Sequence, residues 1–263
     1  MQRRRVADGA VLAFRRREGG AGETVLLLHS LFFDGTMFEA VLPFIGHRPT
    51  LAPDHRGQGA SAAGRDLPTA ELLADDALGL LDALGIAKAH VVGSSMGAYV
   101  ALEMLGRASE RIATLTLSCC TCRPEADPTR FAALADRIAA TGGLGLGEDI
   151  ARLMFSPAFD GRVRDRWRGR FDTLRPGTDD VVRAIFSHRG WTDLLHGWGG
   201  PLLAISGAQD RAKSPADLAW IAAEGLGRHV VIGDAGHTPA VETPGAFADA
   251  LRPFFQQHDR VVA

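Results

Sequence analysis

The sequence predicts an α/β protein, with a mostly parallel sheet and helices on both of its faces. Short apolar runs of strand length alternate with stretches of helical period through the first half of the chain and again near its end. Such alternation is typical of a parallel sheet covered by helices. Between the two regions, at 123–199, the chain becomes polar, Arg-rich and helical in period. We therefore expect one core, formed by 1–122 and 200–263, with a helical cap inserted at 123–199.

The expected elements follow in order along the chain. Asp8-Gly9 separates short runs at 5–6 and 11–14, which is a signal for a β-hairpin. The remaining apolar runs predict strands at 25–28, 50–52, 89–92, 112–117, 202–205 and 229–232. The intervening periodic stretches predict helices at 69–84, 96–105, 216–223 and 245–255.

Composition excludes several classes of protein. The 263 residues carry a net charge of −2, whereas a dedicated nucleic-acid-binding domain is usually strongly basic. No apolar run approaches the length of a membrane span, and no apolar segment follows the basic start as in a signal peptide. Cys119, Cys120 and Cys122 form an odd cluster, which does not suit a disulfide framework or a zinc site. We expect a soluble cytoplasmic protein that acts on a small molecule, without a metal or cofactor, and whose oligomeric state the sequence does not indicate.

The segment Gly93-Ser94-Ser95-Met96-Gly97 contains the candidate nucleophile. It matches G-x-S-x-G, follows a predicted strand and begins a predicted helix. In this setting the central serine lies on a tight, strained turn with its hydroxyl exposed, and the glycines prevent collisions across the turn. The register selects Ser95 rather than Ser94.

A serine nucleophile needs a base, and the base needs an acid that orients it. In the strand–turn–helix architecture these follow the serine in the order acid, then histidine. Asp210 follows the strand predicted at 202–205, and His237 follows the last one, so we predict them as acid and base. Asp234 is the rival acid, but it shares a loop with His237. His29 and His90 border strands and are expected to be packed or hydrogen-bonded residues.

An oxyanion hole requires two hydrogen-bond donors. The backbone N–H of Met96, next to the nucleophile, is the first predicted donor. The second should come from the loop 29–35, where the residues alone leave Ser30 and Leu31 as alternatives.

Five segments in this order resemble the α/β-hydrolase fold superfamily: LHSL at 28–31, PDHRGQGAS at 53–61, GSSMG at 93–97, SGAQD at 206–210 and GHTPAVETP at 236–244. His-Ser at 29–30 replaces the usual His-Gly, and this Ser-Leu variant is similar to 3-oxoadipate enol-lactonase and its neighbouring esterases. The resemblance implies Leu31 as the second oxyanion donor and a lid at 123–199. Haloalkane dehalogenases and epoxide hydrolases with this fold use a carboxylate as nucleophile, so the serine at this position disfavours both of these classes.

The predicted function is a serine hydrolase that cleaves a carboxylic ester or lactone. Pockets under such lids are mostly apolar, and we expect Phe32, Phe155 and Trp191 to contact the substrate. The basic run 162–170 is either a solvated helix face or the source of an arginine that binds a substrate carboxylate. Alternative functions are carbon–carbon bond hydrolysis of a diketone by the same triad, and ligand binding with slow turnover.

Overall fold

The computed structural model describes residues 1–6 and 9–259 and contains one eight-stranded sheet, in the order β1-β2-β4-β3-β5-β6-β7-β8. β1 pairs antiparallel with β2 and β2 with β4, while every other neighbouring pair is parallel. The prediction of a mostly parallel sheet is therefore confirmed. The strands are β1 (Gln2–Arg5), β2 (Val11–Arg17), β3 (Thr24–Leu28), β4 (Thr50–Pro53), β5 (Ala89–Ser94), β6 (Ile112–Ser118), β7 (Leu202–Gly207) and β8 (Arg228–Ile232).

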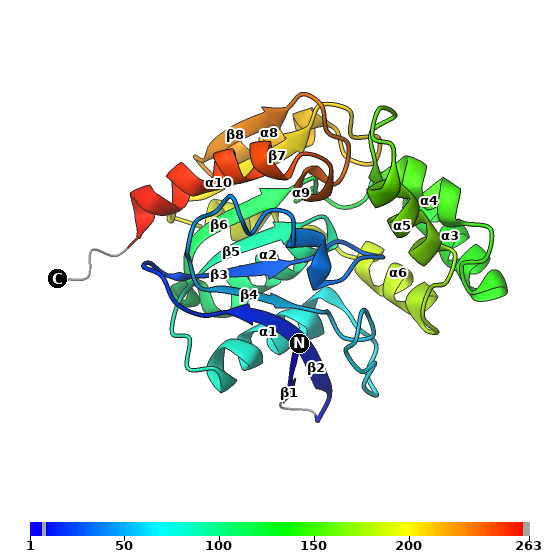
Figure 1. The fold of residues 1–263 in the computed structure, drawn as a ribbon, viewed down its shortest axis with the longest axis horizontal. Coiled ribbons are helices and arrows are strands. Elements are labelled where there is room, and N and C mark those ends of the chain that lie inside the picture. Colours follow the sequence, from blue (N-terminus) through cyan, green and yellow to red (C-terminus); the bar gives the residue numbers. More distant parts are fainter. Residues whose placement is uncertain (7–8, 260–263) are drawn as a thin grey trace.

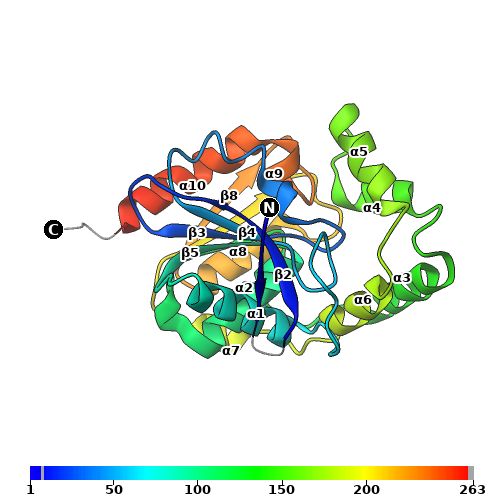
Figure 2. The ribbon, with the colours of Figure 1, turned by 60° about the horizontal axis from the view of Figure 1, so that its bottom comes forward.

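Helices cover both faces of this sheet. Figure 2 shows α9 and α10 on one face and α1, α2 and α7 on the other, while α8 packs on β7 and β8. Leu26, Leu27 and Leu28 of the central strand β3 are completely buried between these layers. The core helices are α1 (Ala70–Ala83), α2 (Met96–Ala108), α8 (Pro215–Glu224), α9 (Pro239–Glu242) and α10 (Pro244–His258), and the short 3₁₀ helices are η1 (Gly35–Phe38) and η2 (Ser109–Arg111).

The N-terminal strand differs from its prediction. The sequence indicated a strand at 5–6, but β1 is Gln2–Arg5 and all of its side chains are exposed. Such a strand has no apolar pattern, because at the edge of the sheet it needs only backbone pairing with β2. Arg5 pairs with Val11, as expected for the hairpin. Asp8 of the predicted turn lies outside the described residues.

Five helices lie between β6 and β7: α3 (Pro128–Thr141), α4 (Gly147–Met154), α5 (Arg162–Phe171), α6 (Thr178–Phe186) and α7 (Thr192–His196). Helices α3 to α6 lie together at one end of the sheet (Figures 1 and 2), whereas α7 packs against α2 and α8. The predicted cap, 123–199, thus includes one helix that lies on the core. The division into core and cap remains a prediction. None of the described helices is long and apolar enough to cross a membrane.

Candidate active site

The turn between β5 and α2 holds Ser95 in a strained conformation. Its φ of 52° lies in the left-handed region, which is costly for a residue with a Cβ. A Cβ on Gly93 would lie 2.3 Å from the carbonyl oxygen of Gly97, and one on Gly97 would lie 2.1 Å from that of Leu28. Both flanking positions therefore require glycine.

Ser95, His237 and Asp210 form a continuous hydrogen-bonded chain. His237 Nε2 lies 2.9 Å from Ser95 Oγ, and His237 Nδ1 lies 2.8 Å from Asp210 Oδ2. The histidine side chain is almost completely buried. The bond to Asp210 orients the ring so that its other nitrogen faces the hydroxyl, which is the geometry of a nucleophile–base–acid triad.

Backbone groups hold the carboxylate of Asp210 in turn. Its Oδ1 accepts hydrogen bonds from the N–H groups of Ala212 and Lys213, at 2.7 and 3.0 Å. The rival acid, Asp234, is exposed and makes no hydrogen bond to His237. The loop after β7 therefore supplies the partner of His237, as the order of the residues predicts.

The two histidines predicted to be packed or hydrogen-bonded have structural contacts. His29 bonds the carbonyl of Ser30 through Nδ1 and accepts the N–H of His55 through Nε2. His90 contacts Thr114 and Asp259. Burial lowers the pKa of His29 and of His90, so both favour the neutral form.

Two backbone donors near Ser95 have no partner. The N–H groups of Leu31 and Met96 make no hydrogen bond within the described part of the chain. Ser30, the other alternative, directs its own N–H to Met37 Sδ, at 3.5 Å. Its hydroxyl lies 3.0 Å from Ser94 Oγ and 3.2 Å from the Ser94 carbonyl oxygen, which links this loop to the end of β5, next to Ser95.

Backbone strain is concentrated around this site. Four non-glycine residues have a positive φ in the described residues, and three of them are Ser95, Phe32 beside Leu31, and Cys119 beside the acid. Conformations of this kind persist only where surrounding contacts enforce them.

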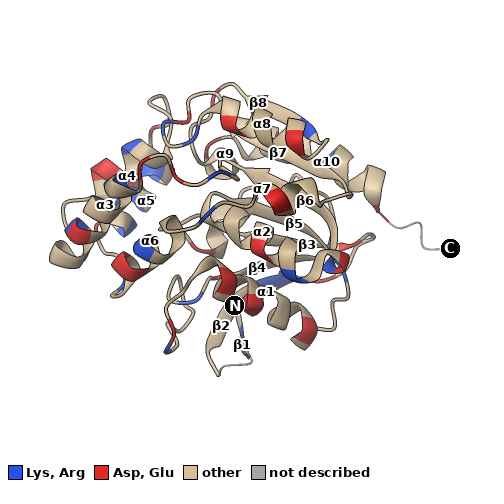
Figure 3. Ribbon diagram, turned by 180° about the vertical axis from the view of Figure 1, so that it is seen from behind, with Lys and Arg blue, Asp and Glu red and all other residues tan. Residues whose placement is uncertain are grey.

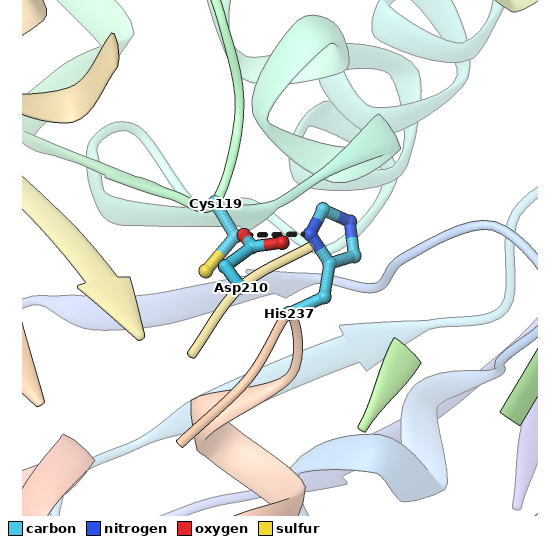
Figure 4. A group of neighbouring side chains, drawn as sticks. All are labelled: Cys119, Asp210 and His237. Carbon is cyan, nitrogen blue, oxygen red and sulfur yellow. Dashed lines mark hydrogen bonds and ion pairs between the residues drawn. The ribbon is translucent and has the colours of Figure 1, made fainter. Parts of the chain in front are cut away.

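Cys119, Asp210 and His237 have ligand-type atoms within 4.8 Å of one another (Figure 4). A metal would require the thiolate form of the cysteine. Burial, together with the charge of Asp210, raises the pKa of the Cys119 thiol well above its usual value. Asp210 and His237 already bond each other, so the group suits an oriented histidine better than a metal.

A mostly apolar cavity adjoins Ser95 and His237. Its empty volume is about 370 Å³, and its other lining residues are Leu31, Phe32, Arg130, Phe131, Leu134, Leu153, Met154, Phe186, Ala212 and Lys213. Of the three residues predicted to contact the substrate, Phe32 lines this cavity.

The structure does not bring Phe155 or Trp191 to this cavity. Phe155 packs edge-on against Phe33 and lines a separate depression beside Arg211. Trp191 stacks on Tyr99, and its indole N–H donates to Glu103 of α2. The segment before α7 has returned to the core at this point, which removes Trp191 from this cavity.

A buried polar cluster beside the cavity was missed at the sequence level. Glu125 accepts hydrogen bonds from Lys213 Nζ at 2.6 and 2.7 Å and from the Tyr99 hydroxyl at 3.0 Å. His188 Nε2 lies 3.6 Å from the same carboxylate. Because Lys213 also donates its backbone N–H to Asp210, the cluster joins the loop of Asp210 to α2 and to the chain after β6. No recognisable sequence motif surrounds Glu125 or Lys213.

Glu125→Gln is expected to destabilise the protein by about 3–5 kcal/mol at neutral pH, because it leaves the Lys213 ammonium buried without its partner. Burial alone would raise the pKa of Glu125, but the nearby His188 ring and the hydrogen bonds from Lys213 lower it from 4.5 to about 2. Because the pKa of Glu125 is lower in the folded protein than in the unfolded chain, its ionised carboxylate stabilises the fold above about pH 4.5. This stabilisation is lost as the pH falls towards 2.

Urea unfolding from pH 7 to pH 2 tests this expectation. The difference in unfolding free energy between wild type and Glu125→Gln should shrink across that acid range. Glu125→Gln/Lys213→Met should recover part of the loss, because it removes both charges. Glu18→Gln, which removes an exposed carboxylate, is the control and should have little effect. A constant difference at every pH would contradict the assignment.

The basic run of α5 pairs largely with acids of the same protein. Arg164 contacts Glu148, Arg168 contacts Asp172, and Arg170 contacts Asp34. Figure 3 shows basic and acidic residues interspersed on α4 and α5. The pattern favours the structural interpretation of most of this run.

The chain belongs to the alpha/beta hydrolase family, whose family model matches residues 25–250. It is similar to a solved thermophilic esterase from Thermogutta terrifontis, with malate bound, at 27% identity and a TM-score of 0.91 over 99% of this chain and 100% of that one. It is also similar to the solved enol-lactonase from Burkholderia xenovorans LB400, at 28% identity and a TM-score of 0.89 over 97% and 100% of the two chains. A curated relative, 2-hydroxymuconate semialdehyde hydrolase from Pseudomonas sp. strain CF600, is 28% identical over 92% of this chain and 90% of its own length.

Proposed function

We propose that this member of the family is a serine hydrolase that cleaves a carboxylic ester or lactone through an acyl-enzyme on Ser95. The observation that carries the proposal is the chain from Ser95 Oγ through His237 to Asp210, with hydrogen bonds of 2.9 and 2.8 Å. The free N–H groups of Leu31 and Met96 support it, since acyl transfer needs donors for an oxyanion.

In the proposed reaction His237 Nε2 takes the hydroxyl proton of Ser95 as Oγ attacks the substrate carbonyl. The oxyanion accepts hydrogen bonds from the Leu31 and Met96 amides, while Asp210 stabilises the imidazolium. Collapse of the tetrahedral intermediate breaks the bond between the carbonyl carbon and the leaving oxygen, and His237 gives its proton to that oxygen. Water then attacks the acyl-enzyme with His237 again as base, and releases the acid and free Ser95.

The cavity favours an uncharged, compact acyl group. Its lining is mostly apolar, and one of its two cationic residues, Lys213, is already neutralised by Glu125. The esterase and enol-lactonase among the similar structures support ester and lactone substrates. The three free, buried cysteines support a reducing, cytoplasmic location.

Carbon–carbon bond hydrolysis is the second candidate, favoured by the similarity to 2-hydroxymuconate semialdehyde hydrolase. A substrate panel separates the two: p-nitrophenyl acetate and butyrate, an enol lactone, and a diketone of similar size. We expect kcat/KM of about 10⁴ M⁻¹ s⁻¹ or more for the best ester or lactone. Faster cleavage of the diketone would favour the second candidate, and saturable binding with only a few turnovers would contradict both.

A further inference from the structure

We infer that helix α5 holds the oxyanion loop, residues 29–35, in its active conformation and that Arg170 acts as a positioning residue through Asp34. The inference rests on the proposed function, because it concerns the donor that Leu31 would offer to the oxyanion.

An ion pair joins these two distant segments. Arg170 Nη2 contacts Asp34 Oδ2, although the residues are 136 positions apart in the sequence. The Asp34 side chain is only 5% exposed, and its other oxygen accepts the N–H of Thr36 at 2.8 Å at the start of η1. Although burial alone would raise the pKa of Asp34, hydrogen bonds from Thr36 and Arg170 lower it. The pair therefore remains charged well into the acid range.

Aromatic contacts from the same helix reach the same loop. Phe33 lies 4.5 Å from Trp167 and 5.3 Å from Phe171 between ring centroids, and Phe32 lies 6.3 Å from Phe171. The Arg170 guanidinium covers the Trp167 ring at 4.5 Å. One face of α5 thus contacts three successive residues of the loop, Phe32, Phe33 and Asp34.

The loop needs such support at its middle. Ser30 fixes one end of it to Ser94, and the Gly35 N–H fixes the other to Asp54 at 2.9 Å. Between them Phe32 has a φ of 71°, which a phenylalanine adopts only when its surroundings enforce it. Leu31 immediately precedes this residue, so relaxation of Phe32 would turn the Leu31 N–H away from the oxyanion.

The test compares Arg170→Gln, Asp34→Asn and the double variant, with p-nitrophenyl butyrate as substrate. Asp34→Asn is informative because asparagine keeps the N-cap acceptor of η1 and loses only the charge. Arg166→Gln is the matched control, since it removes a charge from α5 that pairs with no carboxylate in the described residues.

We expect each single variant to lower kcat about 10- to 100-fold, less than complete loss of an oxyanion donor, with KM within about twofold of wild type. The affinity for an alkylboronic acid, which mimics the tetrahedral intermediate, should fall by the same factor. The double variant should be no worse than either single one, and Arg170→Lys should recover part of kcat.

Three results would overturn the inference: an unchanged kcat in folded Arg170→Gln, a raised KM with kcat unchanged, which would make Arg170 a substrate contact, or additive losses in the double variant. Wild-type protein that turns over no ester or lactone would contradict the proposed function as well. A working wild type with an unaffected Arg170→Gln would contradict this inference alone.

Discussion

Ser95→Ala is expected to lower kcat for p-nitrophenyl butyrate by about 10⁴-fold or more, because no acyl-enzyme can form without Oγ. The fold should persist, since alanine fills nearly the same volume and the strained turn depends on Gly93 and Gly97. Steady-state hydrolysis and mass spectrometry after exposure to a fluorophosphonate test both parts. Wild type should gain one adduct on Ser95, and the variant none.

Ser94→Ala is the control for this prediction, because Ser94 occupies the adjacent place in the motif and is also buried. It loses only the hydrogen bond of its hydroxyl to Ser30, worth about 1 kcal/mol, so kcat should fall less than tenfold. If the Ser94 variant were inactive and the Ser95 variant active, the nucleophile would be misassigned.

The proposed oxyanion loop has His29-Ser30 in place of the usual His-Gly, and the contacts of Ser30 give this difference a physical reason. A glycine at position 30 would have no hydroxyl, whereas Ser30 bonds Ser94, the neighbour of Ser95. Ser30 thereby joins the loop to the turn between β5 and α2, and the contacts of α5 join the same loop to the segment between β6 and β7.

Local sequence signals predicted most of the core. The alternation of apolar runs and helical stretches indicated β3 to β8 closely. β3 to β7 are largely buried, and buried parallel strands are continuously hydrophobic, while the edge strand β8 was marked by the apolar run Val230 to Ile232. The exposed strand β1 had no such signal. Ser95, Asp210 and His237 could be proposed because each follows a recognisable strand, and strand ends meet at one edge of a parallel sheet.

Long-range pairs could not be predicted in this way. Glu125 and Lys213 are 88 residues apart, and Asp34 and Arg170 are 136 apart. Nothing near any of these residues indicates its partner, because the contacts depend on how the insertion folds over the core. The position of Trp191 could not be predicted for the same reason. Its apolar side chain suited the wall of a pocket, and only the path of the chain brings it against Tyr99 of α2.

The second large effect on activity is expected from substitution of Asp210, which of the two candidate acids, Asp210 and Asp234, is the one that bonds His237. Asp210→Asn is expected to lower kcat about 10⁴-fold at neutral pH with KM nearly unchanged. The amide can still accept the N–H groups of Ala212 and Lys213 through its oxygen, so the loop should keep its shape. Its NH₂ group would then face His237 Nδ1 and favour the tautomer that protonates Nε2, which cannot accept the proton of Ser95.

Asp234→Asn is the matched control, since Asp234 is exposed on the loop of His237 and contacts neither nitrogen of its ring. The kcat of the Asp234→Asn variant should stay within about twofold of wild type, because substitutions at exposed positions outside the packed core and hydrogen-bond networks have small effects. Equal losses in both variants would show that charge near His237, not the bond to Asp210, governs the base. A loss confined to Asp210→Asn would instead assign the orienting role to the loop after β7, where backbone amides already fix the direction of the carboxylate.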